Sequence, residues 1–440
     1  MTLNTLTDCQ QEAFNKFVGF LLSNEREFHL FGSAGCGKTF LTRHFVNEGL
    51  KQYRNSCAIL GMTPEPFEVD ITATTNKAAE VLQAAGFKEA TTIFKLFKVR
   101  VVEDYKTGES YLKESNTPIL HQHLIIVDEC SMLPNKMKKI IQSNTYKCKI
   151  VYVGDNYQLA PVKEKPSWNE TPSKTTAILS TPVRNKSSKA LIDLCNQLRT
   201  TVDTQEFKDI QLVTGSIDSL DDKGLQEWLM TTDFSKNRVL SYTNERAIEY
   251  IQWIEKFRNN NPEFLRLNQM YINNTFFNKE DNSQTFYPEE ELIIVKFQNQ
   301  GKTVRCINGY RGDVYELEGV WAIVQDANNK SIVNYDVFIS NNPLKHKQLI
   351  KLAAKRKDWI AYYALLNSVM DLRLPYASTV HKSQGSSFDE VVVDLESFES
   401  CKSYSMASRL LYVAVSRARN KVYFYGDMPK RFGSLLGAFK

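Results

Sequence analysis

The sequence lacks several features that would mark a secreted, membrane-bound or metal-rich protein. Its eight cysteines include no C-x-x-C pair, which argues against a zinc ribbon or a thioredoxin-like site and favours a reducing compartment. Residues 1–11 contain neither a basic stretch nor an apolar core, so we expect no signal peptide. No apolar run approaches the length of a membrane span. These absences predict a cytoplasmic protein without membrane contact.

A large excess of charge of either sign is also missing. The chain of 440 residues has a net charge of +5 at pH 7, which excludes a polycationic coat. Such a mild balance permits nucleic-acid binding in a local groove but does not establish it. The chain is too long for one hydrophobic core, so we expect two to four domains.

The most informative segment that is present is the octet 32–39, which reads G-S-A-G-C-G-K-T and fits the phosphate-binding loop pattern. An apolar strand-like segment, 28–31, precedes it, and a helical segment, 40–46, follows it. Lys38 would reach the β- and γ-phosphates of a nucleotide, and Thr39 would hold Mg²⁺. The residues whose backbone N–H groups would surround the phosphates are Gly35, Cys36 and Gly37. The sequence therefore predicts that the chain binds ATP with Mg²⁺.

Two further strand ends carry polar residues that suit this chemistry. The apolar segment 124–127 runs into Asp128 and Glu129, and ligands bind at such strand ends in parallel sheets. Asp128 would complete the Mg²⁺ shell, and Glu129 would polarise the attacking water. After segment 151–153, Gln158 could sense the γ-phosphate. Taken alone, either segment could be an ordinary polar turn.

Two arginines far along the chain are candidates for an arginine finger. Arg184 and Arg417 lie remote from the phosphate loop in sequence, and a guanidinium from a neighbouring domain can stabilise charge at a γ-phosphate. Arg417 follows an apolar helical segment, 410–415. The alternative for each is an ordinary surface arginine.

The alternation of strand-like and helical segments predicts an α/β fold with parallel sheets. We expect two α/β domains, a β-hairpin inserted into the first, and a small β-barrel with a helical arm over 344–368 inserted into the second. The expected strands of the barrel include 313–318 and 320–325. The expected boundaries are 1–90 with 118–182 for the first domain, 91–117 for the hairpin, 183–261 with 371–440 for the second domain, and 262–370 for the barrel.

At this point the residues resemble a known family. The octet, V-D-E at 127–129, G-D-N-Y-Q-L at 154–159, T-V-H-K-S-Q-G at 379–385 and Y-V-A-V-S-R-A-R at 412–419 follow the order of the superfamily 1 helicase motifs. The form V-H-K-S-Q-G and the barrel insert resemble the 5′-to-3′ subclass that includes RecD-like enzymes, and the compact layout resembles its bacteriophage members. The resemblance implies two RecA-like domains, an SH3-like barrel, and ATP bound between the RecA-like domains.

The resemblance also implies roles for further residues. Gln10 would read the adenine base, Gly385 would join the nucleotide site, and Arg184 and Arg417 would lie at the γ-phosphate. The residues implied to contact single-stranded DNA are Thr75, Asn76, Lys77, Thr243, Asn244, Thr379, His381 and Lys382.

The expected hairpin suggests a wedge that splits the duplex. Its aromatic candidates for stacking on the last base pair are Phe97, Tyr105 and Tyr111, which could instead only pack the hairpin. Cys36 lies beside a lysine and a helix N-terminus, which favour the thiolate, so we expect alkylation to inactivate the enzyme unless the thiol is packed and unreactive.

The predicted function is an ATP-dependent DNA helicase that moves 5′ to 3′ on single-stranded DNA and unwinds duplexes in phage DNA replication or recombination. Expected partners are single-stranded and forked DNA, a single-strand binding protein and replication proteins, and we expect a monomer. The alternatives are a nucleic-acid-stimulated ATPase or an RNA helicase that does not unwind duplex DNA, a protein-remodelling ATPase and a nucleotide-controlled binding switch. A kinase is a weaker alternative, because the second domain would then have no purpose.

Overall fold

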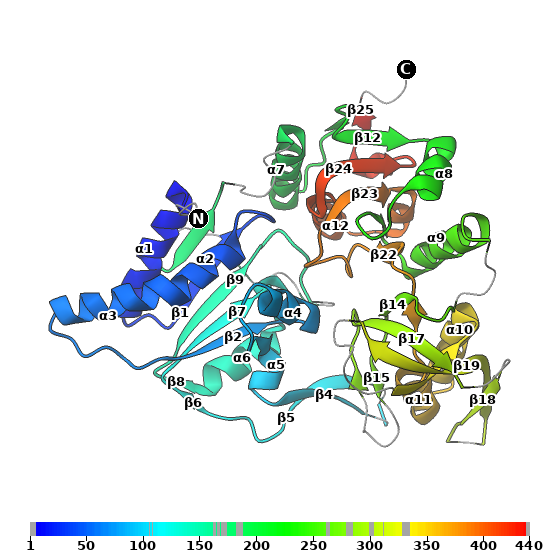
Figure 1. The fold of residues 1–440 in the computed structure, drawn as a ribbon, viewed down its shortest axis with the longest axis horizontal. Helices are drawn as coiled ribbons and strands as arrows, with labels where there is room; N and C mark the ends of the chain where they lie inside the picture. Colours follow the sequence, from blue (N-terminus) through cyan, green and yellow to red (C-terminus); the bar gives the residue numbers. More distant parts are fainter. Residues whose placement is uncertain are drawn as a thin grey trace.

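The first α/β lobe is built on a fully parallel sheet (Figure 1). The computed structural model describes residues 6–104, 106–107, 109–161, 164, 168, 174–181, 188–260, 265–278, 285–298, 303–310, 312–327 and 335–436. The strands follow the order β10 (Thr176–Leu179), β1 (Glu27–Gly32), β9 (Lys149–Gly154), β7 (His123–Asp128), β2 (Glu68–Ala73) and β3 (Thr91–Thr92). The predicted parallel α/β lobe is confirmed.

Helices cover both faces of this sheet because its central strands are apolar on both sides. Along β7, Ile126 joins a core with the N-terminal helices, whereas Ile125 and Val127 join a second core on the other face. The helices are α1 (Asp8–Leu22), α2 (Lys38–His44), the π-helical turn η1 (Phe45–Gly49), α3 (Leu50–Ile59), α4 (Asn76–Ala84), α5 (Ile93–Leu96), the 3₁₀ turn η2 (Cys130–Met132) and α6 (Asn135–Ser143).

Two small pairings complete the first lobe. The predicted hairpin is present as β4 (Val99–Glu103) and β5 (Ser110–Glu114), which pair antiparallel. Short strands β6 (Leu120–His121) and β8 (Thr145–Tyr146) pair in parallel. Helix α1 begins at Asp8, because Thr7 and Gln10 form a capping box.

The second lobe repeats the architecture. Its parallel strands lie in the order β12 (Ile217–Leu220), β24 (Ala418–Tyr425), β23 (Phe388–Asp394), β13 (Arg238–Ser241) and β22 (Ala377–Thr379). Its helices are α7 (Lys189–Thr204), α8 (Asp222–Thr231), α9 (Asn244–Phe257) and α12 (Tyr404–Ser416), with 3₁₀ turns η3 (Glu396–Ser400) and η4 (Lys430–Phe432). Strands β11 (Ile210–Gln211) and β25 (Leu435–Leu436) form a separate pair.

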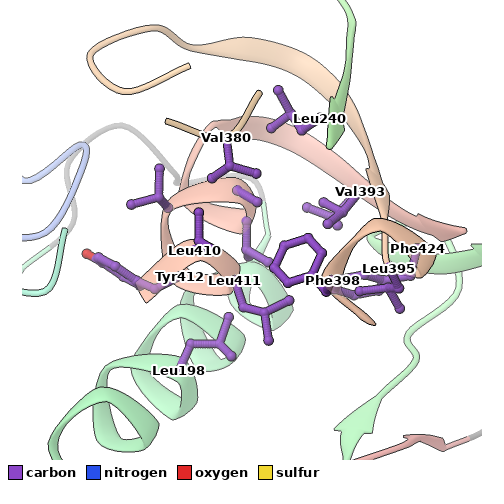
Figure 2. Close-up of a cluster of buried hydrophobic side chains, with 14 of the residues drawn as sticks. Leu198, Leu240, Val380, Val393, Leu395, Phe398, Leu410, Leu411, Tyr412 and Phe424 are labelled. Carbon is purple, nitrogen blue, oxygen red and sulfur yellow. The ribbon is translucent and has the colours of Figure 1, made fainter. Parts of the chain in front are cut away.

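The core of the second lobe explains the apolar character of α12. Figure 2 shows Leu410 and Leu411 of α12 between Leu198 of α7 and the sheet residues Leu240 and Val393. A helix that is buried on nearly all sides needs apolar residues around its whole circumference. This packing fixes α12 firmly, and α12 carries the predicted residue Arg417 at its C-terminal end.

The insert is an antiparallel sheet bent into half a barrel. Strands follow the order β18 (Thr303–Asn308), β19 (Val314–Asp326), β17 (Glu291–Phe297), β14 (Met270–Asn273) and β21 (Leu372–Arg373), and β20 (Tyr335–Ser340) also pairs with β19. A small hairpin of β15 (Phe277–Asn278) and β16 (Thr285–Phe286) lies beside it, and the helical arm is α10 (Pro343–Lys355) with α11 (Trp359–Asn367). Within the described residues the edge strands β18 and β21 do not pair, so the expected small barrel is present as an open half-barrel.

One strand of the insert corrects an expectation. The predicted strands 313–318 and 320–325 form the single strand β19, which pairs with β18 along its first half and with β17 along its second. Gly319 lies where the partners change, and a Cβ there would meet Ile339 O at 2.3 Å. Glycine therefore permits a close crossing where the sequence suggests a break.

Two further predictions concern the boundaries of the domains and contact with a membrane. The residue boundaries of the four parts stay a proposal. No helix among the described residues is long and apolar enough to cross a membrane.

Candidate functional site

The phosphate loop joins β1 to α2 in the first lobe. Gly35 and Gly37 have φ values of 82° and 83°, in the left-handed region that glycine adopts without strain. Lys38 Nζ folds back and donates to Gly32 O at 2.8 Å and Ser33 O at 3.1 Å. Two left-handed glycines and a lysine over the loop form an anion cradle at the start of a helix.

The surroundings of the Lys38 ammonium are acidic. Burial alone would lower its pKa, but nearby acidic groups outweigh burial and raise the pKa of Lys38. These groups are Cys36, Asp155, Glu129 and Asp128. The site therefore keeps a charged lysine ready for a polyphosphate and brings the predicted loop, strand-end and glutamine segments together.

The carboxylates at the end of β7 lie at this same point. Burial and the neighbouring Glu129 raise the pKa of Asp128 to about 7, although the Glu129 N–H donates to Asp128 Oδ1 at 2.9 Å. Glu129 has a left-handed φ of 52°, and its buried Oε2 atom has no hydrogen-bond partner. A half-buried carboxylate pair with an unpartnered oxygen is a donor set that suits Mg²⁺, and the half-buried Thr39 at the start of α2 offers a hydroxyl. The residues present therefore fit the expected cation.

The glutamine segment connects the two lobes. Gln158 is 2% exposed, and its Oε1 atom is buried without a hydrogen-bond partner. Arg409 Nη1 of α12 donates to the backbone oxygens of Asn156 and Gln158, the latter at 2.8 Å. Tyr412 Oη, also of α12, donates to Asp155 Oδ2 at 2.6 Å. The loop that carries Gln158 is thus attached directly to the second lobe.

Arg417 lies near this junction and is almost completely buried. Its guanidinium donates to Val413 O, Ser386 O and Ser416 Oγ. Burial lowers the pKa of Arg417, and the strongest opposing influence is the charge of Glu129 in the other lobe. Arg417 therefore lies within electrostatic reach of the predicted catalytic carboxylate.

Three other residues were predicted to contact the nucleotide, and the structure describes two of them. Gly385 has a φ of 84°, and its neighbour Gln384 reaches across to Ser131 Oγ of the first lobe at 3.5 Å. The amide of Gln10 is engaged at both ends, because Oε1 accepts from Thr7 N and Nε2 donates to Cys36 O. Reading of an adenine by Gln10 stays a prediction that requires these bonds to exchange. Arg184 lies outside the described residues.

The expectation of a reactive Cys36 is wrong. The side chain is fully buried, and burial raises the pKa of the Cys36 thiol despite the influence of Lys38. Local sequence favours a thiolate, but the three-dimensional packing against Gly32 and the apolar core outweighs it.

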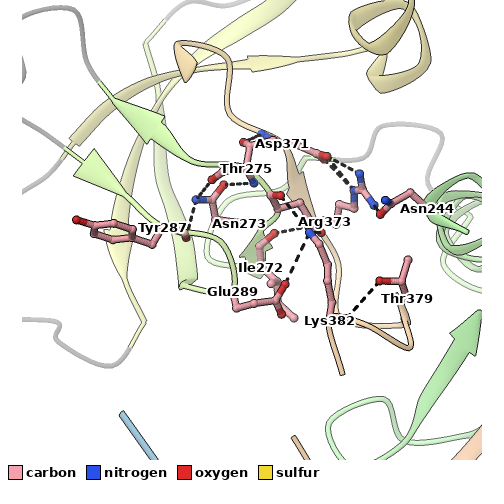
Figure 3. Close-up of polar contacts among 11 residues, drawn as sticks. Asn244, Ile272, Asn273, Thr275, Tyr287, Glu289, Asp371, Arg373, Thr379 and Lys382 are labelled. Atoms are coloured by element: carbon pink, nitrogen blue, oxygen red, sulfur yellow. Dashed lines mark hydrogen bonds and ion pairs between the residues drawn. The ribbon is translucent and has the colours of Figure 1, made fainter. Parts of the chain in front are cut away.

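The residues expected to contact DNA lie at helix starts and loop ends of both lobes. Thr75 caps α4 by accepting from Ala78 N, so that Asn76 is its first residue, and Thr243 caps α9 by accepting from Arg246 N. Asn244 begins α9, and its Oδ1 atom accepts from Arg373 Nη1 at 3.2 Å (Figure 3). In each case a helix N-terminus with N–H groups is presented, which suits phosphate.

The second group surrounds the end of β22. Thr379 Oγ1 accepts from the Lys382 backbone N–H at 3.3 Å. The His381 ring lies 6.2 Å from the Tyr242 ring between centroids, and burial lowers the pKa of His381. His381 is therefore suited to stacking or hydrogen bonding as a neutral ring.

The two lysines of this set contact the insert. Lys77 Nζ forms an ion pair with Glu291 at 3.0 Å, and Lys382 Nζ lies 3.7 Å from Glu289 Oε1 and donates to Asn274 O at 3.0 Å. Figure 3 shows Lys382 and Glu289 directed toward each other from different parts of the chain. Lysines from both lobes thus meet carboxylates at the start of β17.

The three aromatic residues predicted to stack at the fork differ in their exposure to solvent. The proposed stacking role of Phe97 is wrong for this arrangement, because its side chain is fully buried in a core with Ile93 and Val99. Tyr111 on β5 is 48% exposed, with Lys136 Nζ 5.9 Å from its ring centroid. Tyr105 lies outside the described residues.

Sequence reasoning missed Arg409 as a functional residue, and it assigned no separate role to Tyr412 or Asp155. An arginine on an otherwise apolar helix, three residues before Tyr412, was the available signal. Its partners are backbone oxygens, which no sequence pattern identifies.

Two family models match the chain. A model described as an AAA domain matches residues 15–164, and a model described as a UvrD-like helicase C-terminal domain matches residues 374–425. The first match contains the phosphate loop, the carboxylates and Gln158. The second contains segment 379–385 and Arg417.

Relatives of similar length support the same assignment. ATP-dependent DNA helicase dda of Enterobacteria phage T4 is 23% identical over 96% of this chain and 100% of its own length. ATP-dependent DNA helicase Pif1 of Campylobacter jejuni is 22% identical over 89% and 86%. The crystal structure of a Bacteroides Pif1 helicase with ADP-AlF3 and single-stranded DNA has a similar fold, with a TM-score of 0.50 and 15% identity over 97% and 94% of the two chains. The chain belongs to the superfamily 1 family of ATP-dependent 5′-to-3′ DNA helicases that includes Dda, Pif1 and RecD.

Proposed function

We propose that this chain hydrolyses ATP to move 5′ to 3′ along single-stranded DNA and to separate the strands of a duplex. The observation that carries the proposal is the junction of the two lobes. There, Gln158 of the first lobe is held by Arg409 of the second, and Arg417 lies within reach of the charge of Glu129. A site divided between two lobes can convert nucleotide turnover into relative motion of the lobes.

The roles of the nucleotide residues follow from their positions. Lys38 exchanges its two carbonyl partners for the β- and γ-phosphates, while the N–H groups of Gly35 to Gly37 bind the remaining oxygens. Glu129 accepts a hydrogen bond from the attacking water, and its buried Oε2 atom without another partner supports this role. Thr39 and Asp128 would hold Mg²⁺, which neutralises phosphate charge when bound.

Opening and closing of the junction provide the coupling. Gln158 detects the water and the γ-phosphate, and its buried amide oxygen without a hydrogen-bond partner supports this role. Its backbone is fixed by Arg409, so a shift of Gln158 is passed directly to α12. Arg417 stabilises the charge that develops at the γ-phosphate, and we retain Arg184 as a second candidate for this role.

Single-stranded DNA is the proposed track. Support comes from the helix N-termini at Asn76 and Asn244, the lysines Lys77 and Lys382, and the names of the relatives, which are DNA helicases. The Bacteroides Pif1 structure, whose description includes single-stranded DNA, has a similar fold. Tyr111 is the proposed wedge residue of the hairpin, because it is exposed at the first lobe.

The biological setting is also a proposal. Similarity to a helicase of phage T4 supports a role in phage DNA replication or recombination, with a single-strand binding protein and replication proteins as partners. All eight cysteines are free thiols, which fits a reducing cytoplasm. We expect the active form to be a monomer.

The proposal is tested by ATPase assays with and without single-stranded DNA, followed by unwinding of duplexes with a 5′ or a 3′ tail. Strong stimulation and unwinding of the 5′-tailed duplex alone are expected. ATPase activity that no oligonucleotide changes would contradict the proposal. Stimulation without strand separation would favour the alternative of a nucleic-acid-stimulated ATPase, and activity on RNA duplexes alone would favour an RNA helicase.

A further inference from the structure

Helix α10 of the insert carries an unusual concentration of positive charge. The segment 343–357 contains six lysine or arginine residues and no aspartate or glutamate. The whole chain has a net charge of only +5, so the rest of the chain is close to neutral. These cations are Lys345, Lys347, Lys351, Lys355, Arg356 and Lys357.

Three of these lysines form a stripe along one face of α10. Lys347, Lys351 and Lys355 are spaced four residues apart, which places them on the same face at steps of about 6 Å. Like charges at this spacing destabilise a helix by a few tenths of a kcal/mol per pair, whereas a solvated helix face normally alternates its charges. Lys351 and Lys355 are exposed and have no ion-pair partner among the described residues.

The stripe begins at the edge of the proposed DNA track. Lys347 forms an ion pair with Glu245, and the charge of Lys351 also acts on that carboxylate. Glu245 follows Asn244 at the start of α9, where the second lobe is expected to contact DNA. A strand that leaves the second lobe at Asn244 therefore meets the stripe next.

We propose that Lys347, Lys351 and Lys355 form an accessory surface that binds the phosphate backbone of the single strand beyond the second lobe. This inference rests on the proposed function, because it extends the same track. Three cations at regular steps, of which Lys351 and Lys355 are exposed and Lys347 is paired only with the half-exposed Glu245, match a chain of phosphates.

The test compares the full-length double variant Lys351→Gln/Lys355→Gln with the control Lys51→Gln/Lys223→Gln. The control lysines are exposed on α3 and α8 and lie outside the proposed track. Affinity is measured by fluorescence anisotropy over a range of salt concentrations, with oligothymidylates of about 8 and about 20 nucleotides. The double variant should reduce the slope of log K against log salt by about 1.4 for the long strand only.

The possible results distinguish a failure of the lysine surface from a failure of the proposed function. An unchanged slope for the long strand, equal to the control, overturns the surface while leaving the proposed function intact. If the double variant reduces the slope of log K against log salt only for blunt duplex DNA, the surface does not bind single-stranded DNA and the proposal is wrong. Failure of the unmodified protein to bind any oligonucleotide instead contradicts the proposed function.

A second inference rests on different contacts, those of the acidic residues at the start of β17. Glu291 pairs with Lys77 of the first lobe, and Glu289 lies against Lys382 of the second. Glu289 has a left-handed φ of 74°, which is uncommon for a side chain of this kind, and its Oε1 atom is buried without a hydrogen-bond partner. The segment is therefore held in a strained conformation against two lysines that DNA is expected to need.

We infer that Glu289 and Glu291 occupy the two lysines in the DNA-free protein and are displaced when a phosphate backbone binds. The inference depends on the proposed function, because Lys77 and Lys382 are proposed DNA contacts. The carboxylates of the insert then compete with the DNA phosphates for Lys77 and Lys382. This competition lowers the affinity of the protein for single-stranded DNA.

The variant Glu289→Gln/Glu291→Gln is compared with Glu316→Gln/Glu318→Gln, which removes two exposed carboxylates from β19 of the same insert. The first variant should bind the short oligothymidylate about 3- to 10-fold more tightly than the control, because no carboxylate of the insert then competes and only Glu80 of α4 still lies near Lys77. Unchanged affinity overturns the inference. Weakened affinity also overturns it, since the carboxylates would then position the lysines for DNA.

Discussion

The lysine of the phosphate loop and the lysines of the proposed DNA track have different kinds of hydrogen-bond and ion-pair partners. Lys38 donates to two neutral carbonyl oxygens of its own loop, whereas Lys77 and Lys382 contact carboxylates that belong to the insert. An incoming phosphate replaces neutral partners at Lys38 but must compete with negative charge at the other two. We therefore expect the nucleotide site to be ready to bind, and the proposed DNA track to be restrained until the carboxylates of the insert move away.

The largest effect that can break this comparison is expected at Lys38. Lys38→Ala should reduce ATP turnover by about 10²–10³-fold, the usual loss when one group that stabilises developing charge is removed. DNA affinity without nucleotide should stay unchanged, because the restraint on Lys77 and Lys382 is intact. Parallel measurement of turnover and oligonucleotide binding checks this, and equal loss of both would contradict the separation of the two sites.

The next effect concerns the contact that joins the two regions. Arg409→Ala should lower kcat for DNA-stimulated ATPase about tenfold with little change in KM, because Gln158 loses a charged hydrogen-bond donor while the phosphate loop is untouched. Arg409→Lys should restore part of the rate. The surface variant Arg431→Ala serves as the control, since its ion-pair partner Glu399 is exposed and belongs to η3, not to the loop that carries Gln158. A change in KM alone would contradict a positioning role.

Acid should act on the two regions with opposite signs. The carboxylate of Asp128 has a pKa of about 7, so its charge, and with it cation-dependent ATPase activity, should decline several-fold as the pH falls from 8 to 6. Burial raises the pKa of Glu289, so proton uptake there in acid should release Lys382 and strengthen DNA binding. Turnover at pH 8 and 6, and oligonucleotide affinity over a series of falling pH values, test this, with Glu289→Gln expected to lose the pH-dependent gain in affinity.

A smaller effect is expected at the hairpin. Tyr111→Ala should slow strand separation about fivefold while sparing DNA-stimulated ATPase, because only base stacking at the fork is removed. Tyr146→Ala removes another exposed aromatic ring of the first lobe and should change neither quantity. If both activities fall together in the Tyr111 variant, the hairpin is structural only.

The smallest effect is one of stability in the ligand-free protein. The folded-state pKa of Asp128 lies above the ordinary value of 3.8, so its contribution to stability is fully present below that value and is lost as the pH rises through about 7. Asp128→Asn removes this buried charge and should raise Tm at pH 8 by about 2–4 °C while abolishing ATPase. A thermal scan without nucleotide checks the sign, and a lower Tm would contradict it.

Sequence was sufficient where function depends on neighbouring residues. The left-handed glycines, Lys38 and the carboxylates at the end of β7 all follow from short patterns on buried strands. The sequence alone was insufficient where tertiary packing decides whether a side chain is buried. Cys36 has neighbours that favour a thiolate but lies in a core, and Phe97 lies beside the hairpin but packs inward.

Contacts between distant segments could not be predicted either. Lys77 and Glu291 are 214 residues apart, and Arg409 reaches carbonyl groups some 250 positions earlier in the chain. Gly319 was read as a break because glycine usually ends a strand, whereas here it allows two neighbouring strands to approach closely.

The continuity of β19 has a mechanical consequence. Its thirteen residues span about 43 Å and are hydrogen-bonded to β18, β20 and β17 in turn, so the half-barrel resists internal sliding. Glu291, the first residue of β17, belongs to this sheet. We therefore expect a displacement of the insert to move the sheet as one body and to carry Glu291 away from Lys77.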